Sequence, residues 1–171
     1  MPGPVPASTA GMSGEYLDPL WRIPLALRPV EIDLLRSAAL RRLHFIAHGG
    51  ASIVTTLQSY SRLEHTLGVF ALVTHFHPEN TSLRVAALLH DIGHLPLSHT
   101  FEGLAGRNHH ALGMDMLRAA PLAGVLRAHG IDAALVSGIL AGRVDSPLMS
   151  RDGLRNLDHL DSYVRSGRAA G

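Results

Sequence analysis

Histidine is the residue type of this chain best suited to chemistry. Twelve of its 171 residues are histidine, against eight Phe, Trp and Tyr residues together, and imidazole both binds metal ions and exchanges protons near neutral pH. The chain has no cysteine, so thiolate metal sites, disulfides and cysteine nucleophiles are excluded. The composition therefore points to metal or acid–base chemistry based on histidine and carboxylate.

Two neighbouring helices are predicted to position the first of these histidines. A capping box of Ser61 and Glu64 starts a helix over residues 61–76, and Pro78 prevents its continuation. A second helix is predicted over residues 80–91. Because only about four residues join the two helices, they should form an antiparallel hairpin.

The hairpin should bring two histidines to the same height. His65 lies 13 residues before Pro78 and His90 lies 12 residues after it, which at about 1.5 Å per residue places them roughly 20 and 18 Å from the turn. Asp91 follows His90 at the end of its helix. Two imidazoles and a carboxylate without thiolate suit a six-coordinate divalent ion such as Mn, Fe, Co, Ni or Mg.

A further acidic ligand is expected from a helix predicted over residues 152–166. Asp158 and Asp161 lie three residues apart on one face of this helix. Either carboxylate satisfies the pattern, because the spacing alone does not choose between them.

The remaining pattern is helical and predicts a single all-α domain. An amphipathic helix follows Pro29 and ends at Gly49, and residues 51–60 are expected to form an irregular connection. Residues 1–17 are expected to be a flexible tail and residues 18–171 the domain. No convincing alternating strand is found. Further helices are predicted over residues 97–104, 109–119, 121–129 and 131–141.

The charge and hydropathy of the chain limit its partners. Fifteen basic residues, all arginine, against fourteen acidic residues give a net charge of +1, which is too small for nucleic-acid binding by bulk charge. The longest apolar runs have five residues, far below the roughly 18 needed to cross a bilayer, and no secretory signal is recognisable. We therefore expect a cytoplasmic protein that acts on a small molecule. The oligomeric state, including a homo-oligomer, stays open.

Three blocks of the sequence resemble the HD-domain phosphohydrolase superfamily, which is named after a His…His-Asp…Asp set of metal ligands. The blocks are SRLEHTLG at residues 61–68, HDIGHLPLSHTFE at residues 90–102 and LDHLD at residues 157–161. The resemblance implies an HD-domain helical bundle and favours Asp158 over Asp161. The metal ligands that it implies are His65, His90, Asp91 and Asp158.

The resemblance is strongest toward the deoxynucleotide triphosphohydrolase branch, in which five equivalent positions surround the phosphates. Those positions are occupied here by Arg62, His94, His99, Glu102 and His109. The resemblance implies that Arg62 clamps a phosphate and that His94 or His109, oriented by Glu102, protonates the leaving oxygen.

The substrate contacts differ from those of that branch. Where those enzymes use Gln, Lys, Tyr and Asp to grip the sugar and phosphates, the corresponding residues here are His48, His159, Ser162 and Ser166. Those enzymes also continue well beyond the position of Gly171. The sequence is therefore more similar to small HD phosphohydrolases, including those of nucleoside-antibiotic pathways, that strip phosphates from nucleotides.

The favoured hypothesis is a metal-dependent phosphohydrolase that removes single phosphates from nucleoside mono-, di- or triphosphates or from a modified nucleotide. Two alternatives stay open. One is a deoxynucleoside triphosphate triphosphohydrolase that releases tripolyphosphate, and the other is a non-enzymatic HD module that binds a metal or nucleotide to regulate a partner.

Overall fold

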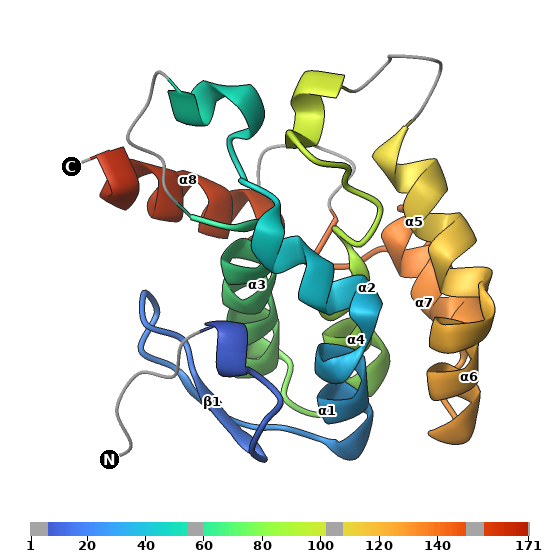
Figure 1. The fold of residues 1–171 in the computed structure, drawn as a ribbon. Coiled ribbons are helices and arrows are strands. Elements are labelled where there is room, and N and C mark those ends of the chain that lie inside the picture. Colours follow the sequence, from blue (N-terminus) through green and yellow to red (C-terminus); the bar gives the residue numbers. More distant parts are fainter. Residues whose placement is uncertain (1–6, 55–59, 102–107, 150–155, 171) are drawn as a thin grey trace.

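Two antiparallel helices, α3 (Arg62–Phe76) and α4 (Thr81–Leu89), form the centre of the protein (Figure 1). The structure is a computed structural model that describes residues 7–54, 60–101, 108–149 and 156–170. The predicted capping box is confirmed, because Ser61 Oγ accepts from the Glu64 amide and Glu64 Oε2 accepts from the Ser61 amide at 2.7 Å. α3 is buried along most of its length, as expected of a helix with apolar residues on all sides.

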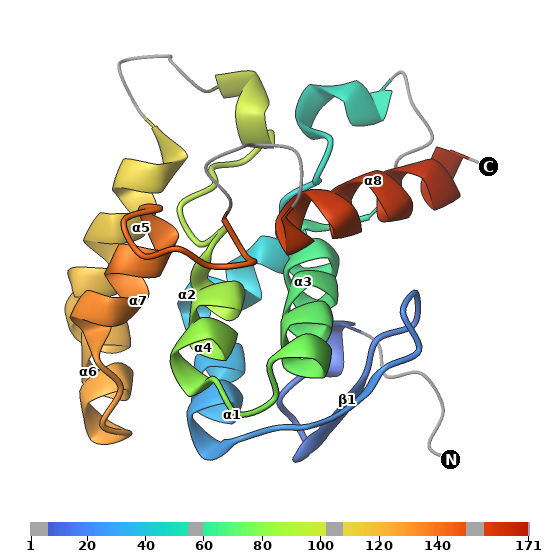
Figure 2. The same ribbon diagram turned by 180° about the vertical axis from the view of Figure 1, so that it is seen from behind.

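α8 (Leu157–Ala170) lies across the N-terminal half of α3, as seen in Figure 1 and from behind in Figure 2. The two helices approach closely at Gly68. A Cβ at this position would collide with the Asp161 carboxylate and the Arg165 guanidinium. Glycine at position 68 therefore allows the last helix to bring its carboxylates to the first histidine helix.

Three helices cover the other side of α4 (Figure 2): α5 (His109–Arg118), α6 (Ala120–Ala128) and α7 (Ala133–Leu140). Their bounds match the predicted helices within two residues. α5 begins against the loop that follows α4, where a Cβ at Gly93 would collide with the His109 carbonyl. Among the described residues no single helix is long and apolar enough to cross a membrane, and only α6 and α7 together, bent by 119°, meet that length and composition.

The helix predicted between Pro29 and Gly49 is wrong as one continuous element. It consists of α1 (Pro29–Arg36), α2 (Ala38–Arg41) and a 3-10 helix at Arg42–Phe45. The break occurs at Ser37, whose backbone is extended and whose side chain caps α2. A hydroxyl side chain that accepts a hydrogen bond from a backbone amide competes with helix continuation. The spacing of apolar residues is nearly the same on both sides of a one-residue break, so it does not reveal the break.

A small antiparallel sheet precedes α1, although no strand was predicted. β1 (Glu15–Leu17) pairs with β2 (Pro24–Ala26), and strands of three residues are too short to produce a recognisable alternation. The connection is held by Asp18, whose Oδ1 accepts from the backbone amides of Leu20 and Trp21 at 2.9 and 2.8 Å.

Part of the expected N-terminal tail is packed against the core. Ala7–Thr9 form a 3-10 turn, and Ala10 and Tyr16 are each only 2% exposed. The expectation of a flexible tail is therefore wrong over residues 7–17. Composition could not reveal this, because the burial depends on contacts with residues far along the chain.

Some predicted elements extend beyond the described residues. Of the helix predicted over residues 97–104, the described part is a 3-10 helix at Ser98–Phe101. Residues 51–54 belong to a 3-10 helix, Gly50–Val54, in the expected irregular connection. The all-α fold class is confirmed, with the small sheet as an addition.

Two arginines near α1 and α2 tie neighbouring loops to these helices. Arg36 Nε donates to the Gly11 carbonyl at 2.8 Å, and Arg42 donates to the carbonyls of Ile92 and His94. Through these hydrogen bonds Arg42 fixes the loop that carries His94.

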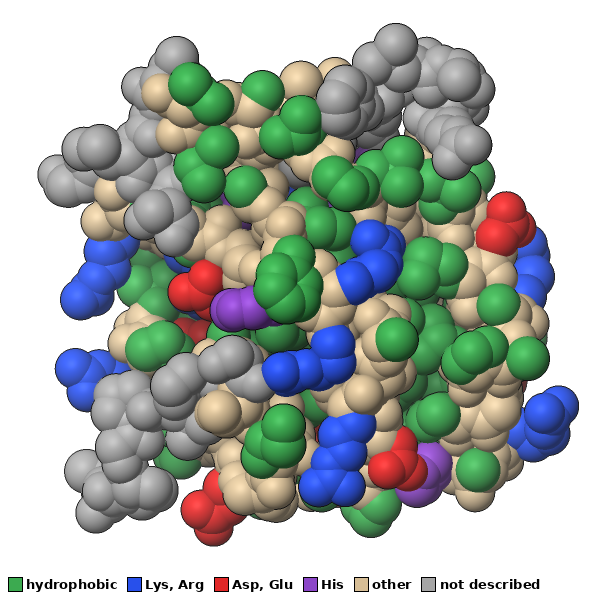
Figure 3. Space-filling view, in the orientation of Figure 1, with side chains coloured by type: hydrophobic (Ala, Val, Ile, Leu, Met, Phe, Trp, Pro, Cys, Tyr) green, Lys and Arg blue, Asp and Glu red, His purple; other side chains and the backbone are tan. Residues whose placement is uncertain are grey.

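On the face shown in Figure 3, the cationic side chains (blue) are separated by hydrophobic and other surface.

Candidate metal centre

The two histidines of the hairpin meet at the end predicted for them. His65 lies in α3 and His90 caps the C-terminus of α4. Their Nε2 atoms are 3.4 Å apart. Each of these nitrogens therefore faces the same small volume at the surface of the core.

Two carboxylates face this volume as well. Asp158 Oδ1 lies 2.9 Å from His65 Nε2 and 3.7 Å from His90 Nε2. Asp91 Oδ2 lies 3.8 and 3.5 Å from the same two nitrogens. Four candidate ligand atoms from α3, the end of α4 and α8 therefore converge.

Asp161 lies on the opposite side of His65 and does not share this volume. Its Oδ2 is 2.8 Å from His65 Nδ1, and its Oδ1 accepts from Trp21 Nε1 at 2.6 Å. Arg165 donates to both oxygens at 2.9 Å. The spacing left Asp158 and Asp161 as alternatives, whereas the structure separates them by the edge of the ring that each one contacts.

Hydrogen bonds at Nδ1 orient both rings. His90 Nδ1 donates to the Ala87 carbonyl at 2.8 Å, which leaves the Nε2 lone pair directed at the shared volume. Asp161 accepts from Nδ1 of His65 in the same way. A hydrogen bond of this kind at the second nitrogen is typical of metal-binding histidines.

Burial and neighbouring charges shift the pKa values of these residues in opposite directions. Burial lowers the pKa of His65, but its hydrogen bonds to Asp158 and Asp161 outweigh burial and raise the pKa to about 9. Burial raises the pKa of Asp158, but the hydrogen bond from His65 and the charge of His90 bring it to about 2. The pKa of Asp91 is also held well below its usual value, because His90, Arg62 and His94 outweigh the effect of burial. Both carboxylates are thus ionised at neutral pH, as metal ligands must be.

This donor set fits a divalent cation. His65, His90 and Asp158 offer three ligand atoms within 4.8 Å of one another, and Asp91 adds a fourth on the same side. Two imidazoles and two carboxylates provide nitrogen and oxygen donors without sulfur, and the two negative charges balance a doubly charged ion. Such a set suits Mn, Fe, Co, Ni or Mg.

Arg62 is buried beside the group, with 3% of its surface exposed. Its Nη1 donates to Asp91 Oδ2 at 2.8 Å and its Nη2 donates to the His48 carbonyl at 3.1 Å. The guanidinium therefore orients Asp91 and also lines the neighbouring cavity.

A second histidine group, His94, His99 and His109, adjoins Asp91. His94 Nε2 lies 3.2 Å from Asp91 Oδ1, and burial lowers the pKa of His94 despite that hydrogen bond. Nitrogens of the three rings lie within 4.8 Å of one another. However, the rings of His94 and His109 are stacked with centroids 4.0 Å apart and planes at 16°. Their lone pairs therefore lie in two nearly parallel planes and are poorly placed to share one ion. Glu102, predicted to orient this group, lies outside the described residues.

A cavity of about 600 Å³, which we call the polar cavity, opens beside both groups. It is lined by all the residues that the sequence analysis assigned to substrate contacts: Arg62, His48, His99, His159, Ser162 and Ser166. His48 Nε2 lies 3.2 Å from Ser162 Oγ, and Ser166 Oγ lies 2.7 Å from the Tyr60 hydroxyl. Burial lowers the pKa of His48 to about 2, so this residue presents a neutral ring to the cavity.

The sequence of this chain is similar to that of known proteins. The HD domain family matches residues 62–142. A metal-dependent phosphohydrolase, cns2, of Cordyceps militaris is 32% identical over 136 residues, which are 76% of this chain and 39% of that protein. Residues 62–142 of this chain are an HD domain.

Other relatives match shorter stretches of the chain. The deoxynucleoside triphosphate triphosphohydrolase SAMHD1 of Xenopus laevis is 31% identical over 94 residues, covering 46% of this chain and 15% of that protein. An uncharacterized protein of Methanocaldococcus jannaschii is 29% identical over 129 residues, covering 67% of this chain and 28% of that protein. The chain thus spans well under half the length of these relatives.

The family match includes His65, His90 and Asp91 but ends before Asp158. The position of Asp158 beside the other three is therefore an independent observation of the structure. Sequence reasoning missed Trp21, which is 140 residues away from Asp161 and carries no signal of that contact. Arg165 could have been found, because it lies four residues after Asp161 on the same face of a helix.

The polar cavity is also lined by residues that the sequence analysis did not single out. They are Gly49, His110, Met149, Asn156 and Tyr163. Asn156 caps the start of α8, because its Oδ1 accepts from the His159 amide at 2.7 Å. An Asn just before an amphipathic helix is a recognisable capping signal, so this residue could have been found from the sequence.

Proposed function

We propose that this protein is a divalent-metal-dependent phosphohydrolase that removes phosphate from nucleotides. The observation that carries the proposal is the convergence of His65 with His90, Asp91 and Asp158. The last three residues line the polar cavity. In this proposal these four residues hold the ion. Asp161 is a positioning residue that acts through His65.

The bound cation would supply Lewis-acid chemistry, lowering the pKa of a water molecule and neutralising charge on a phosphate oxygen. Hydrolysis breaks the bond between phosphorus and the leaving oxygen, which must take up a proton. We assign this proton to His109, which lines the polar cavity. His94 is less suited, because its pKa is lowered and its Nε2 is directed at Asp91, so we assign to it the positioning of Asp91.

Substrate contacts are assigned to the remaining histidines and serines of the polar cavity. His99 and Arg62 would face the phosphate, and His48, His159 and Ser162 the sugar. A single orthophosphate is the product that this set favours. Selecting only the α-phosphorus of a triphosphate requires a fixed grip on the whole chain of phosphates, and a neutral His48 and short serines supply less of that grip than charged or longer side chains.

A second candidate is a triphosphohydrolase that releases tripolyphosphate in one step. The similarity to the triphosphohydrolase SAMHD1 of Xenopus laevis favours this second candidate. The two candidates share the metal centre and differ in the phosphorus atom attacked, so the products distinguish them.

A nucleotide panel tests the proposal. Metal-free protein is loaded with Mn²⁺, Fe²⁺, Co²⁺, Ni²⁺ or Mg²⁺ and incubated with nucleoside mono-, di- and triphosphates, and the products are separated by ion exchange. Orthophosphate release that requires the added ion supports the proposed function. Tripolyphosphate as the sole initial product would replace it with the second candidate, and no hydrolysis of any nucleotide would contradict both.

A further inference from the structure

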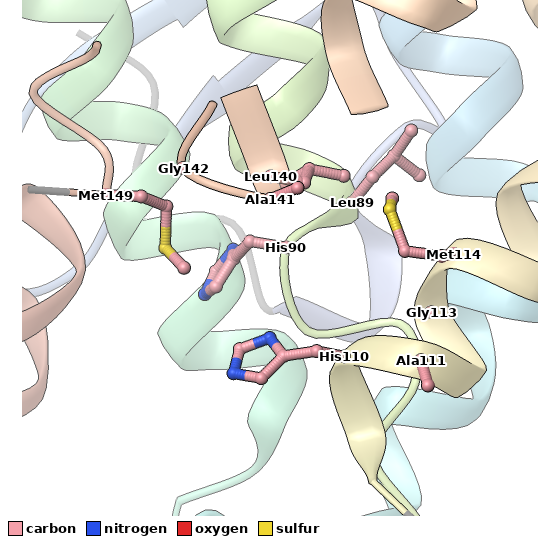
Figure 4. Close-up of a pocket in the computed structure, with 10 residues that line it drawn as sticks. All are labelled: Leu89, His90, His110, Ala111, Gly113, Met114, Leu140, Ala141, Gly142 and Met149. Atoms are coloured by element: carbon pink, nitrogen blue, oxygen red, sulfur yellow. The ribbon is translucent and has the colours of Figure 1, made fainter. Parts of the chain in front are cut away.

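A second cavity, mostly apolar, adjoins the metal centre. It has a volume of about 400 Å³ and lies between the end of α4, the start of α5 and the end of α7 (Figure 4). Its larger apolar side chains are those of Leu89, Met114, Leu140 and Met149. We call it the apolar cavity. Its size falls within the range of small-molecule sites.

The apolar cavity is adjacent to the polar cavity. His90, His110 and Met149 line both of them. His90 forms the wall between them, with Nε2 directed at His65 and Nδ1 held by the Ala87 carbonyl. A phosphate ester bound at the metal centre could therefore extend its organic part past His90 into the apolar cavity.

Few side chains of the apolar cavity can form hydrogen bonds. Among its described lining residues, only His90 and His110 carry nitrogen or oxygen in their side chains, and the nitrogens of His90 are directed at Ala87 and His65. The thioethers of Met114 and Met149 adapt to the shape of a ligand and make favourable contacts with aromatic rings. The cavity is therefore built to select by shape and apolar area.

We propose that the apolar cavity binds the organic group of the phosphate substrate and prefers a flat aromatic ring, such as a nucleobase, without distinguishing one base from another. The inference rests on the proposed phosphohydrolase function, which places the phosphate at the metal centre. It assigns selectivity for the leaving group to Met114, Leu140 and Met149.

A pair of matched substrates tests this assignment. Adenosine 5′-monophosphate and ribose 5-phosphate share the ester and the sugar and differ in the ring. The variant Ala111→Phe would narrow the apolar cavity, because Ala111 lines its exposed rim. Ala134→Phe is the matched control, because Ala134 is an exposed helical alanine in the first turn of α7 outside both cavities.

The two variants should respond differently. Ala111→Phe should raise the KM for adenosine 5′-monophosphate roughly tenfold or more, since burying an aromatic group is worth at least that factor. It should leave kcat/KM for ribose 5-phosphate within about twofold, and Ala134→Phe should change neither value. Equal losses on both substrates, or an unchanged KM for the nucleotide, would overturn the assignment.

Binding of adenosine, which has no phosphate, separates this inference from the proposed function. Titration of metal-free protein, followed by NMR, should show binding by the wild type and Ala134→Phe, and a loss of roughly tenfold in Ala111→Phe. Met114→Ala, which removes apolar contacts without adding bulk, should also weaken adenosine binding. Equal affinity in all four proteins, or no binding by the wild type, would overturn the inference. Selective loss in Ala111→Phe without hydrolysis of any phosphate ester would support the ring site and contradict only the phosphohydrolase function.

Discussion

Asp161 Oδ2 lies 2.8 Å from Nδ1 of His65, on the edge of the ring opposite the Nε2 that faces Asp158. The two aspartates of α8 therefore hold the same histidine from its two sides. A carboxylate bonded to the far nitrogen fixes the tautomer and orientation of a ligand histidine. In the proposed function, this relationship makes Asp158 a metal ligand and Asp161 a residue that positions His65.

Substitution of the two aspartates should distinguish the proposed ligand from the residue that orients His65. Asp158→Ala removes a proposed ligand and should weaken Mn²⁺ binding by more than about 100-fold, whereas Asp161→Asn removes an orienting carboxylate and should cost about 10- to 100-fold. Calorimetric titration of Mn²⁺ into metal-free protein measures both affinities, and circular dichroism checks that each variant is folded. The reverse order would mean that the register of α8 against α3 is wrong.

The close approach of α3 and α8 gives a prediction about Gly68. Gly68→Ala should lower the free energy of unfolding by about 1–3 kcal/mol, because a methyl group there would displace the buried Asp161–Arg165 pair. It should also weaken metal binding, since Asp161 would move away from His65. Urea unfolding and metal titration measure the two effects.

Gly167→Ala provides the matched control for that experiment. A Cβ at Gly167 would meet nothing within 4 Å, and alanine favours a helix by about 1 kcal/mol over glycine. This variant should be as stable as the wild type or more stable, with unchanged metal affinity. Equal losses in both variants would show that the effect of Gly68→Ala does not come from the close approach of α3 and α8.

Stability of the metal-free protein should depend on the protonation of His65. The pKa of His65 is raised from 6.5 to about 9 by its two carboxylate partners, so the stabilisation is fully present below pH 6.5 and is lost as the pH rises to 9. The linked free energy is on the order of 3 kcal/mol. Urea unfolding with a chelator at pH 6 and pH 9.5 should show this decrease, and His65→Ala should flatten it. A wild-type stability that stays constant or rises over this range would contradict the ion pairing of His65.

The proposed substrate grip predicts the pattern of products. Nucleoside mono-, di- and triphosphates should all release orthophosphate, with little difference among bases, because no fixed grip selects one phosphorus atom. Product separation over a time course, with each base in turn, measures this pattern. Hydrolysis of a single base, or of triphosphates alone, would contradict it.

The meeting of His65 and His90 could be anticipated from the sequence because it depends on local rules. The rise per residue of a helix and a short turn at Pro78 were enough to bring His65 and His90 to one height. The choice of Asp158 over Asp161 came from family resemblance, since their spacing allows either, and the structure provides the physical reason in the edges of the His65 ring. Burial of Arg62 against Asp91 was missed, because a position on a helix face does not reveal the partner.

The differences arise where long-range contacts decide the structure. Trp21 donates a hydrogen bond to Asp161, which lies 140 residues further along the chain. Trp21 lies between the two short strands, and the first of these strands falls within the region expected to be a flexible tail. The break at Ser37 depends on one side-chain hydrogen bond. The apolar cavity depends on α4, α5 and α7 meeting beside His90, and no periodicity in any one of these helices could have shown it.

The most direct test of the account measures metal content and hydrolysis together in the wild type, His90→Ala and Asp91→Ala. Metal analysis after loading should find about one ion per chain in the wild type and little in either variant, with circular dichroism unchanged because apolar packing holds the helices. Nucleotide hydrolysis should follow the metal, appearing only in the loaded wild type. Full hydrolytic activity in a variant that contains no metal would contradict the account.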